Sequence, residues 1–389
     1  MQREKIAFSG GKIFICLQKI IFMKLKIFFL AIIMLSGIMQ ILKSQTVKTP
    51  VKVAVIGLTH THVHWILGRE NHNDIQIVAI VEPHRELAER YSKQHGFSMD
   101  IVFNTMEEMF AKTKPEAVTA FGSIYDHLKV VEFCAPRGIH VMVEKPLAVS
   151  LEHAEKMKGL AQKYHIHLLT NYETSWYSSN KKALEYVIEQ KKVGDLRKIV
   201  FHTGHQGPIE IGCNPEFTDW LTDPVLNGGG ALTDFGCYGA NIATGLMKGQ
   251  KPISVFCTTQ QTKPEIYPKV DDDCTILLSY PKVQVIIQAS WNWPFNIKDM
   301  EIYGQNGYLV CEDKNHINYR WKNQIEAVEE IIPDNEAPYN DPFAYLAAVV
   351  RNEINPTAFD LSSLETNMIV MEILEAAKKS AKRGKVVKL

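Results

Sequence analysis

VKVAVIG, residues 51–57, is a short apolar run that ends in a glycine, and the segment after it reads as a helix up to about Gly68. Residues 75–81, IQIVAIV, form a second apolar run, which is followed by Glu82 and Pro83. Short apolar runs that alternate with helical segments are typical of parallel strands covered by helices on both faces. This stretch therefore predicts a doubly wound α/β domain.

The alternation of strands and helices continues to about residue 170. A capping box at residues 105–108 opens one of the helices, and Ser150 can cap another. Residues 50–170 are therefore predicted to form one doubly wound domain with a parallel sheet. We expect its further helices over residues 84–95, 126–137 and 151–164 and its further strands over residues 116–121, 139–143 and 166–170.

The pattern changes after residue 171, because several long strands follow with few helices between them. Partly alternating strands of this kind are typical of an antiparallel sheet with one face against helices. Residues 171–389 are therefore predicted to form an α+β domain with an open, mostly antiparallel sheet, whose other face can meet a second subunit. We expect helices over residues 180–192, 234–247 and 362–383 and strands over residues 197–203, 252–260, 273–280, 283–291, 299–303 and 308–311.

The N-terminal segment has a different composition from the rest of the chain. Residues 27–42 read IFFLAIIMLSGIMQIL and carry no charge, and Lys24 and Lys26 precede them. A short basic segment before an apolar run of this length predicts a signal peptide over residues 1–46, with Met23 as an alternative start. An uncleaved membrane anchor over residues 27–42 is the other interpretation. Both place the main body outside the cytoplasm, and we expect an exported, periplasmic protein.

The charge balance argues against nucleic acid as a partner. Lys plus Arg and Asp plus Glu number 43 each, so the chain has no basic excess. Hydrophobic residues make up 46% and charged residues 22%, which is typical of a globular protein rather than a disordered one. The cysteines after residue 46 are scattered and form no CxxC pair, so we expect small buried residues rather than a disulfide framework.

The turn after the first strand reads Gly57-Leu58-Thr59-His60-Thr61-His62. A dinucleotide fingerprint would read GxGxxG, and only its first glycine is present. Gly57 permits the tight turn, and the N-terminus of the following helix offers backbone N–H groups to a pyrophosphate. Thr59 hinders close approach of the backbone but offers a hydroxyl. We assign Gly57, Thr59 and His60 to a cofactor site.

Glu82 strengthens this assignment. It follows the second strand, 25 residues after Gly57. An acidic side chain at this place accepts hydrogen bonds from the adenosine ribose, and it repels a 2′-phosphate. Glu82 therefore favours NAD over NADP as the cofactor. The alternative is a solvated loop glutamate.

Glu144-Lys145-Pro146 follows the predicted strand at residues 139–143. The carboxyl ends of the strands face the ligand crevice in a doubly wound fold. A lysine there can lie beside the nicotinamide and the reacting hydroxyl, where its charge stabilises a developing alkoxide. We assign Glu144 and Lys145 to the cofactor site and Lys145 also to catalysis. The alternative is a lysine on the surface at the end of a strand.

Five segments together resemble the glucose–fructose oxidoreductase/inositol dehydrogenase (Gfo/Idh/MocA) family. They read VKVAVIG, IVEP, GIHVMVEKPLAVS, GDLRKIVFH and GGGALTDFGCYGANI, and the resemblance runs from about residue 51 to residue 311. It implies a Rossmann domain with a second, sheet-based domain, NAD(P) binding and chemistry on the hydroxyls of a carbohydrate. It also implies a dimer or tetramer formed through the open sheet.

The segment 228–241, GGGALTDFGCYGAN, gains a meaning from this resemblance. Asp234 and Tyr238 are spaced i, i+4 and share one helix face. The resemblance implies that Tyr238 is the acid/base and that Asp234, which we also assign to catalysis, binds substrate hydroxyls or holds the geometry. A nearby Lys145 ammonium is expected to lower the pKa of Tyr238 and so make it a proton acceptor. The alternatives are a core aromatic ring for Tyr238 and a carboxylate that complements the helix dipole for Asp234.

Two softer assignments concern the substrate. Tyr172 follows the last strand of the first domain, and His205 follows a strand near the presumed crevice. We assign both to substrate binding, together with Asp234.

Three histidines alternate with other residues at positions 60, 62 and 64. The His-x-His spacing resembles the first metal ligands of amidohydrolase barrels, and His60 and His64 can share a metal at i, i+4. No later cluster of metal ligands is evident in the sequence. We therefore expect no metal, and phosphate or substrate contact is the preferred interpretation.

The sequence leaves three hypotheses for function. The first is an NAD-dependent oxidoreductase that takes a hydride from a sugar or polyol. The second is a glycoside-cleaving or epimerising enzyme in which NAD is oxidised and reduced within one turnover. Export favours the second, because a tightly held cofactor needs no external NAD pool. The third is a non-catalytic sugar-binding protein on a dehydrogenase scaffold.

Overall fold

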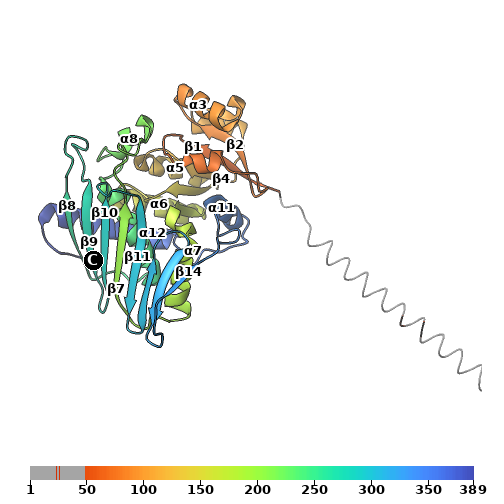
Figure 1. The fold of residues 1–389 in the computed structure, drawn as a ribbon. Helices are drawn as coiled ribbons and strands as arrows, with labels where there is room; N and C mark the ends of the chain where they lie inside the picture. The colour runs from red at the N-terminus through yellow and green to blue at the C-terminus, as the bar shows by residue number, and fades with distance from the viewer. Residues whose placement is uncertain (1–22, 24–25, 27–48) are drawn as a thin grey trace, which may run out of the picture. The chain divides into compact units, whose positions relative to one another are not determined.

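The computed structural model describes residues 23, 26 and 49–389 (Figure 1). The signal-peptide prediction for residues 1–46 therefore lies outside the described residues, apart from Met23 and Lys26. In this described part of the chain, no helix has both the length and the apolar character that a bilayer crossing requires. The helices and strands below belong to one compact unit, Pro50–Leu389. The predicted boundary between residues 170 and 171 stays a prediction.

The first sheet is parallel and has the strand order β3-β2-β1-β4-β5-β6. The order reverses beside β1, which has β2 on one side and β4 on the other, so the ligand crevice is expected at the carboxyl end of β1. The predicted doubly wound sheet is confirmed. Its strands are β1 (Val51–Ile56), β2 (Ile75–Val81), β3 (Val102–Phe103), β4 (Ala117–Ala120), β5 (His140–Glu144) and β6 (Leu168–Asn171).

The helices of this half begin where the sequence provides caps. The Thr105 hydroxyl accepts the Glu108 N–H at 3.1 Å, and the Ser150 hydroxyl accepts the His153 N–H at 3.2 Å. These bonds satisfy N–H groups that lack a partner inside the helix. The helices are α2 (Val63–Leu67), α3 (Arg85–His95), α4 (Met106–Lys112), α5 (His127–Cys134) and α6 (Leu151–Tyr164), with short 3₁₀ turns at Met99–Ile101, Ile124–Asp126 and Ala135–Arg137.

The second sheet has the order β14-β13-β12-β11-β7-β10-β9-β8-β15, and β7 and β10 are its parallel pair among the described strands. The predicted open, mostly antiparallel sheet is confirmed. The sequence analysis did not predict β13 to β15, which are exposed or half-exposed at most positions, and β14 and β15 are the two edge strands. The strands are β7 (Leu196–Gly204), β8 (Ser254–Gln260), β9 (Asp273–Ser279), β10 (Gln284–Ser290), β11 (Ile297–Gly304), β12 (Gly307–Cys311), β13 (His316–Trp321), β14 (Val328–Ile331) and β15 (Val387–Lys388).

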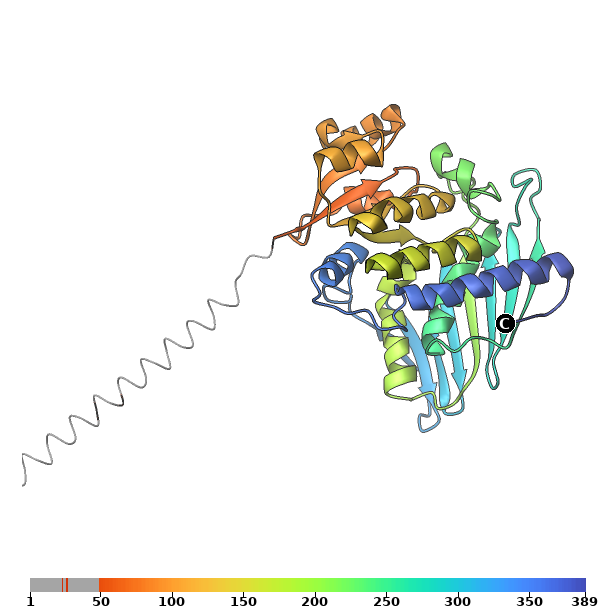
Figure 2. The ribbon, with the colours of Figure 1, turned by 180° about the vertical axis from the view of Figure 1, so that it is seen from behind.

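Helices cover one face of this second sheet, and α12 crosses it beside α6 (Figure 2). In β9, Cys274, Ile276 and Leu278 are buried while the residues between them are half-exposed, as expected of a sheet with one covered face. All six cysteines of residues 49–389 are free, and every one but Cys213 is buried, as predicted. The remaining helices are α7 (Ser178–Leu184), a π-helical turn (Glu185–Glu189), α8 (Pro215–Leu221), α9 (Ala231–Asp234), α10 (Gly236–Leu246), α11 (Pro342–Val350), α12 (Leu364–Arg383) and a 3₁₀ turn (Glu173–Trp176).

Helix α8 was not predicted, and it bears on the site. It lies in the connection between β7 and α9, yet it contacts the first half of the chain. The Glu216 carboxylate forms an ion pair with Arg90 and accepts the Tyr91 hydroxyl at 3.1 Å. Because Arg90 and Tyr91 belong to α3, these bonds hold α8 beside the carboxyl end of the parallel sheet (Figure 1).

Candidate active site

The turn after β1 requires glycine at its first position. Gly57 has a φ of +81°, and a Cβ atom there would lie 2.7 Å from the Gly122 nitrogen. A side chain at residue 57 would therefore clash with the loop that follows β4. This close approach of two backbones at the switch point confirms the tight turn that the sequence predicted.

Glu82 joins the ends of β1 and β2. Its side chain is 2% exposed, and its two oxygens accept the Leu58 N–H at 2.9 Å and the His84 N–H at 2.8 Å. Burial raises the pKa of Glu82, and the two backbone hydrogen bonds oppose this shift. The alternative of a solvated loop glutamate is therefore wrong.

A cavity of about 290 Å³ lies beside this turn. Gly57, Val81, Pro83 and Gly122 are among its lining residues. Its apolar walls at the ends of β1, β2 and β4 fit the flat adenine ring, and the neighbouring Glu82 carboxylate is a hydrogen-bond acceptor for a ribose. The residues present therefore fit the adenosine half of a dinucleotide.

The turn at residues 57–62 is less well suited to a pyrophosphate, because three of its backbone N–H groups already donate hydrogen bonds within the protein. Leu58 N–H binds Glu82, His60 N–H binds the Phe121 carbonyl at 2.8 Å, and His62 N–H binds Nδ1 of His60 at 3.1 Å. A pyrophosphate that used these donors would have to replace the existing bonds. Thr59 lies at the edge of another cavity, of about 460 Å³, below α8.

His60 is a buried ring under α8. Its side chain is 1% exposed, and its ring lies 5.0 Å from the Phe217 ring and 5.5 Å from the Trp220 ring. Burial and the nearby charge of Lys145 lower the pKa of His60 well below its ordinary value, so the imidazole is neutral. The assignment of His60 to the cofactor stays a prediction.

Lys145 and Asp234 form a buried ion pair at the end of β5. Each side chain is 6% exposed, and Lys145 Nζ also donates to the Asp234 carbonyl at 3.0 Å. The second carboxylate oxygen of Asp234 accepts the Trp291 indole N–H at 2.9 Å. The alternative of a surface lysine is therefore wrong, and the structure brings the predicted catalytic residues Lys145 and Asp234 into direct contact.

Each member of this ion pair keeps the other charged despite burial. Burial alone would raise the pKa of Asp234, but the charge and hydrogen bond of Lys145 outweigh it and the pKa is lowered. Burial alone would lower the pKa of Lys145, but Asp234 outweighs it and the pKa is raised. The site therefore holds a carboxylate and an ammonium at neutral pH.

Tyr238 lies beside the pair, but the expected direction of its pKa shift is wrong. Lys145 Nζ is 5.1 Å from the centre of the Tyr238 ring, so the ammonium lies over the ring. Burial, followed by the charge of Glu173, raises the pKa of Tyr238 well above its ordinary value. The charge of Asp234 also raises the pKa of Tyr238. The phenol is therefore a proton donor in this structure.

The two predicted substrate residues lie in the same region. The Tyr172 ring lies 5.6 Å from the Tyr238 ring, and its buried hydroxyl has no hydrogen-bond partner within the described part of the chain. His205 accepts the Gly207 N–H at Nδ1, 2.9 Å away, so its other ring nitrogen carries the proton. Burial lowers the pKa of His205 to about 4, so it is a neutral hydrogen-bond donor.

Two segments of this chain match models of known protein families. Residues 51–172 match the model described as an oxidoreductase family with an NAD-binding Rossmann fold, and residues 182–310 match the Gfo/Idh/MocA C-terminal domain. Together the two matches cover more than half of the chain. The chain belongs to the Gfo/Idh/MocA family. Its first half is thus the NAD-binding fold of that family.

Several curated Gfo/Idh/MocA relatives are similar in sequence. Trans-1,2-dihydrobenzene-1,2-diol dehydrogenase of Xenopus tropicalis is 27% identical over 219 residues, which are 56% of this chain and 61% of the relative. The NADP⁺-dependent scyllo-inositol 2-dehydrogenase of Bacillus subtilis is 20% identical over 85% of this chain and 96% of the relative. The match to the diol dehydrogenases thus spans less than two thirds of their length.

Solved structures of the family share the fold. Aldose-aldose oxidoreductase from Caulobacter crescentus, complexed with glycerol, has a TM-score of 0.74 at 19% identity, covering 87% of this chain and all of that chain. An inositol dehydrogenase homologue from Azotobacter vinelandii, complexed with NADH and myo-inositol, has a TM-score of 0.71 at 15% identity. The match covers 88% of this chain and 98% of that chain. At these identities the similarity establishes the architecture alone.

This Gfo/Idh/MocA member also has site contacts that the sequence analysis missed. His62 Nδ1 lies 2.9 Å from the Glu144 carboxylate, whose other oxygen accepts the Asn171 amide at 2.7 Å. Glu144 and Asn171 are partners in the β5–β6 register, so alignment of the two predicted strands is the signal that indicates this contact. His64 instead meets His95 at 2.8 Å, so the structure does not bring His60 and His64 together as a pair of metal ligands.

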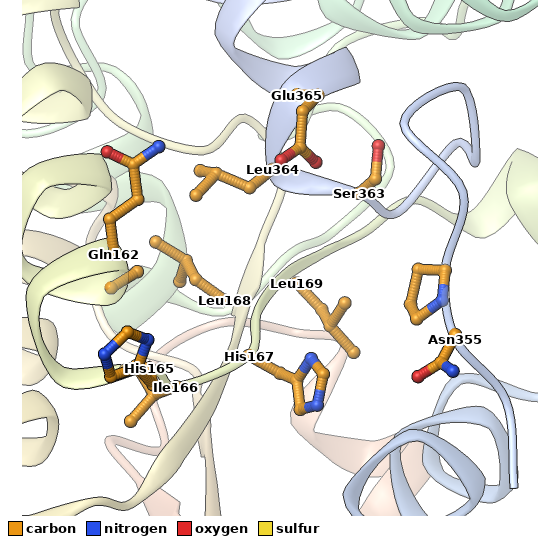
Figure 3. A pocket seen from close by; sticks show the side chains of 12 residues that line it. Gln162, His165, Ile166, His167, Leu168, Leu169, Asn355, Ser363, Leu364 and Glu365 are labelled. Atoms are coloured by element: carbon orange, nitrogen blue, oxygen red, sulfur yellow. The ribbon is translucent and has the colours of Figure 1, made fainter. Parts of the chain in front are cut away.

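Figure 3 shows a cavity of about 310 Å³ that belongs to another part of the family fold. His165, His167 and Leu169 line it on one side, and Ser363 and Glu365 at the start of α12 line it on the other. It contains none of the predicted site residues. Because it includes the start of β6 rather than the carboxyl ends of the strands, we do not assign it to the active site.

Proposed function

We propose that this protein is an NAD(P)-dependent oxidoreductase that acts on a hydroxyl group of a sugar or polyol and prefers NAD. The observation that carries the proposal is the buried Lys145–Asp234 pair beside Tyr238, at the carboxyl edge of an NAD-binding fold. The names of the diol and inositol dehydrogenases among its relatives support the same class of substrate.

The roles of the side chains follow from their charges. When bound, the nicotinamide ring supplies a hydride acceptor for alcohol oxidation and a hydride donor for the reverse reaction. The Lys145 ammonium stabilises negative charge on the reacting oxygen, and Asp234 keeps that ammonium charged and in place. Tyr238 is protonated, so it can give a proton to a carbonyl oxygen during reduction. For oxidation, Tyr238 has to release its own phenolic proton to solvent before the phenolate can accept the proton of the substrate hydroxyl, and a Lys145 ammonium that is less closely paired with Asp234 would favour that phenolate.

The test starts with the small molecules that the purified, denatured protein releases, measured by mass spectrometry. Bound NAD in a one-to-one ratio would support a cofactor that is recycled within each turnover, and it would direct assays to epimerisation and glycoside cleavage. An empty protein that binds added NAD⁺ and forms NADH with polyols or aldoses is the expected result. A protein that binds neither NAD nor NADP would refute the proposal and leave the sugar-binding hypothesis.

The preference for NAD rests on Glu82. Glu82→Ala is expected to weaken NAD⁺ binding roughly 10–100-fold, because hydrogen bonds to a buried carboxylate are worth about 1.5–3 kcal/mol. NADP⁺ binding should fall less, since the 2′-phosphate no longer meets a negative charge. Calorimetric titration with both nucleotides measures the change, and Glu132→Ala, an exposed glutamate on α5, is the control. Equal losses for the two nucleotides would contradict the ribose role.

We also propose that the chain is exported, on the basis of the N-terminal pattern Lys24–Lys26 and residues 27–42. Expression of the full chain in a Gram-negative host should give a periplasmic protein whose N-terminal sequence begins near residue 46. The alternative of a membrane anchor predicts an uncleaved chain in the membrane fraction. A soluble cytoplasmic protein that keeps residues 23–46 would contradict both.

A further inference from the structure

Two segments far apart in the sequence place three metal-ligating side chains together. His60 and His62 come from the turn between β1 and α2, and Glu144 is the last residue of β5. One potential ligand atom from each of the three lies within 4.8 Å of the other two. The centres of the His60 and His62 rings are 4.5 Å apart, and His62 Nδ1 lies 2.9 Å from the nearer oxygen of the Glu144 carboxylate.

The Glu144 carboxylate lacks a strong cationic partner. It is 2% exposed, and within the described part of the chain its ion-pair partner is His62. The neighbouring ammonium of Lys145 pairs with Asp234 instead. Since buried charges in proteins are paired or coordinate metals, a carboxylate in this position favours a bound cation.

The surroundings orient this carboxylate as they do in metal sites. The Asn171 amide donates to Glu144 Oε1 at 2.7 Å, and the Trp176 indole N–H in turn fixes the Asn171 oxygen at 2.9 Å. Chains of hydrogen bonds behind the ligands hold them in position and tune their affinity for the ion. Glu144 is therefore held with its other oxygen, Oε2, directed at His62.

We propose that His60, His62 and Glu144 bind one divalent transition-metal ion of the zinc class. Two imidazoles and one carboxylate are the protein ligands of catalytic zinc sites that keep a fourth position open. Glu144 is the last residue of β5 and Lys145 follows it, so the proposed metal site lies at the same edge of the sheet as the site of the proposed function. Metal binding itself does not depend on the nucleotide or on the proposed reaction.

Binding of a metal ion requires local changes in the three side chains. His60 Nδ1 accepts the His62 N–H, which leaves the proton on the other ring nitrogen. Coordination through Nε2 moves that proton to Nδ1 and breaks the bond from the His62 N–H, and coordination through Nδ1 requires the same bond to break. Ligands about 2.1 Å from one ion lie at most about 4.2 Å apart, and the three potential ligand atoms lie within 4.8 Å of one another, so at most a small closing of the side chains is needed. His62 can move because its side chain is 17% exposed.

The test measures metal binding by the full-length chain after removal of its affinity tag. Dialysis against a chelator and then against Zn²⁺, followed by elemental analysis, should give about one bound zinc per chain. Titration with Co²⁺ should give the visible absorption bands of a low-coordinate site. His62→Ala and Glu144→Gln are each expected to weaken binding at least about tenfold. His64→Ala, which alters the next histidine of the same turn, should bind as the unaltered protein does.

The outcomes separate this inference from the proposed function. Less than a tenth of an equivalent of zinc and no cobalt bands in the folded protein would overturn the metal site, even if NAD⁺ binds. Unchanged affinity in both His62→Ala and Glu144→Gln would also overturn it. Stoichiometric zinc that depends on these residues, in a protein that binds no dinucleotide, would support the metal site and refute the proposed function. Circular dichroism establishes that each variant is folded, and Glu144→Gln keeps the side-chain shape if His62→Ala does not fold.

Discussion

Lys145→Met is expected to lower kcat by at least about 10²–10³-fold, because the ammonium is the positive charge placed to stabilise the reacting oxygen. Methionine keeps the apolar length of the lysine side chain but leaves the Asp234 carboxylate buried without its counter-ion, so circular dichroism has to establish that the variant is folded. Binding of NAD⁺ should fall much less than kcat, since the adenosine half of the site lies at Gly57 and Glu82. Steady-state kinetics with the substrate found in the first assay, together with calorimetric titration of NAD⁺, measure the two effects separately.

The control for this prediction is Lys145→Arg, which keeps the positive charge. A planar guanidinium does not reproduce a compact ammonium, so partial recovery of kcat is the expected result. Unchanged kcat in Lys145→Met would remove Lys145 from the mechanism. Loss of NAD⁺ binding in the same variant would instead make Lys145 a residue that binds the cofactor.

The second large effect concerns stability. Asp234→Ala is expected to lower the free energy of unfolding by about 3–5 kcal/mol, because it leaves the Lys145 ammonium buried without its counter-ion. The double variant Lys145→Met/Asp234→Leu should regain much of this loss, since neither charge then remains buried. Urea unfolding followed by circular dichroism measures the differences. Asp334→Ala, which breaks the exposed pair with Lys314, should cost at most about 1 kcal/mol.

The stability that Asp234→Ala loses should depend on pH in a direction that the pKa of Asp234 determines. The folded pKa of Asp234 is lowered, so its contribution is present above the unfolded pKa and disappears as the pH falls through the folded value. The gap between the unaltered protein and Asp234→Ala should therefore narrow in acid. A gap that widens in acid, or a double variant no more stable than Asp234→Ala, would contradict the paired-charge interpretation.

Much of the fold follows from local patterns in the sequence. The apolar runs at 51–57 and 75–81 form β1 and β2, and the caps at Thr105 and Ser150 begin helices where the sequence predicted them. These features depend on neighbours within a few residues, so sequence reasoning recovers them. The strands β13 and β14 lack such a signal, because they are half-exposed and pair at the sheet edge.

The sequence by itself determined the fold class and the chemical types of the residues at the site. Only the tertiary structure decided their charges and partners, since burial and contacts between distant segments are not local properties. Tyr238 is protonated because it is buried and lies near the charge of Glu173, and no spacing in the sequence reports either fact. His62 meets Glu144, 82 residues away, because the ends of β1 and β5 lie at one edge of the same sheet. Contacts between segments far apart in the sequence also place α8 over His60. They bring His60, His62 and Glu144 together as a candidate metal site, where the sequence predicted none.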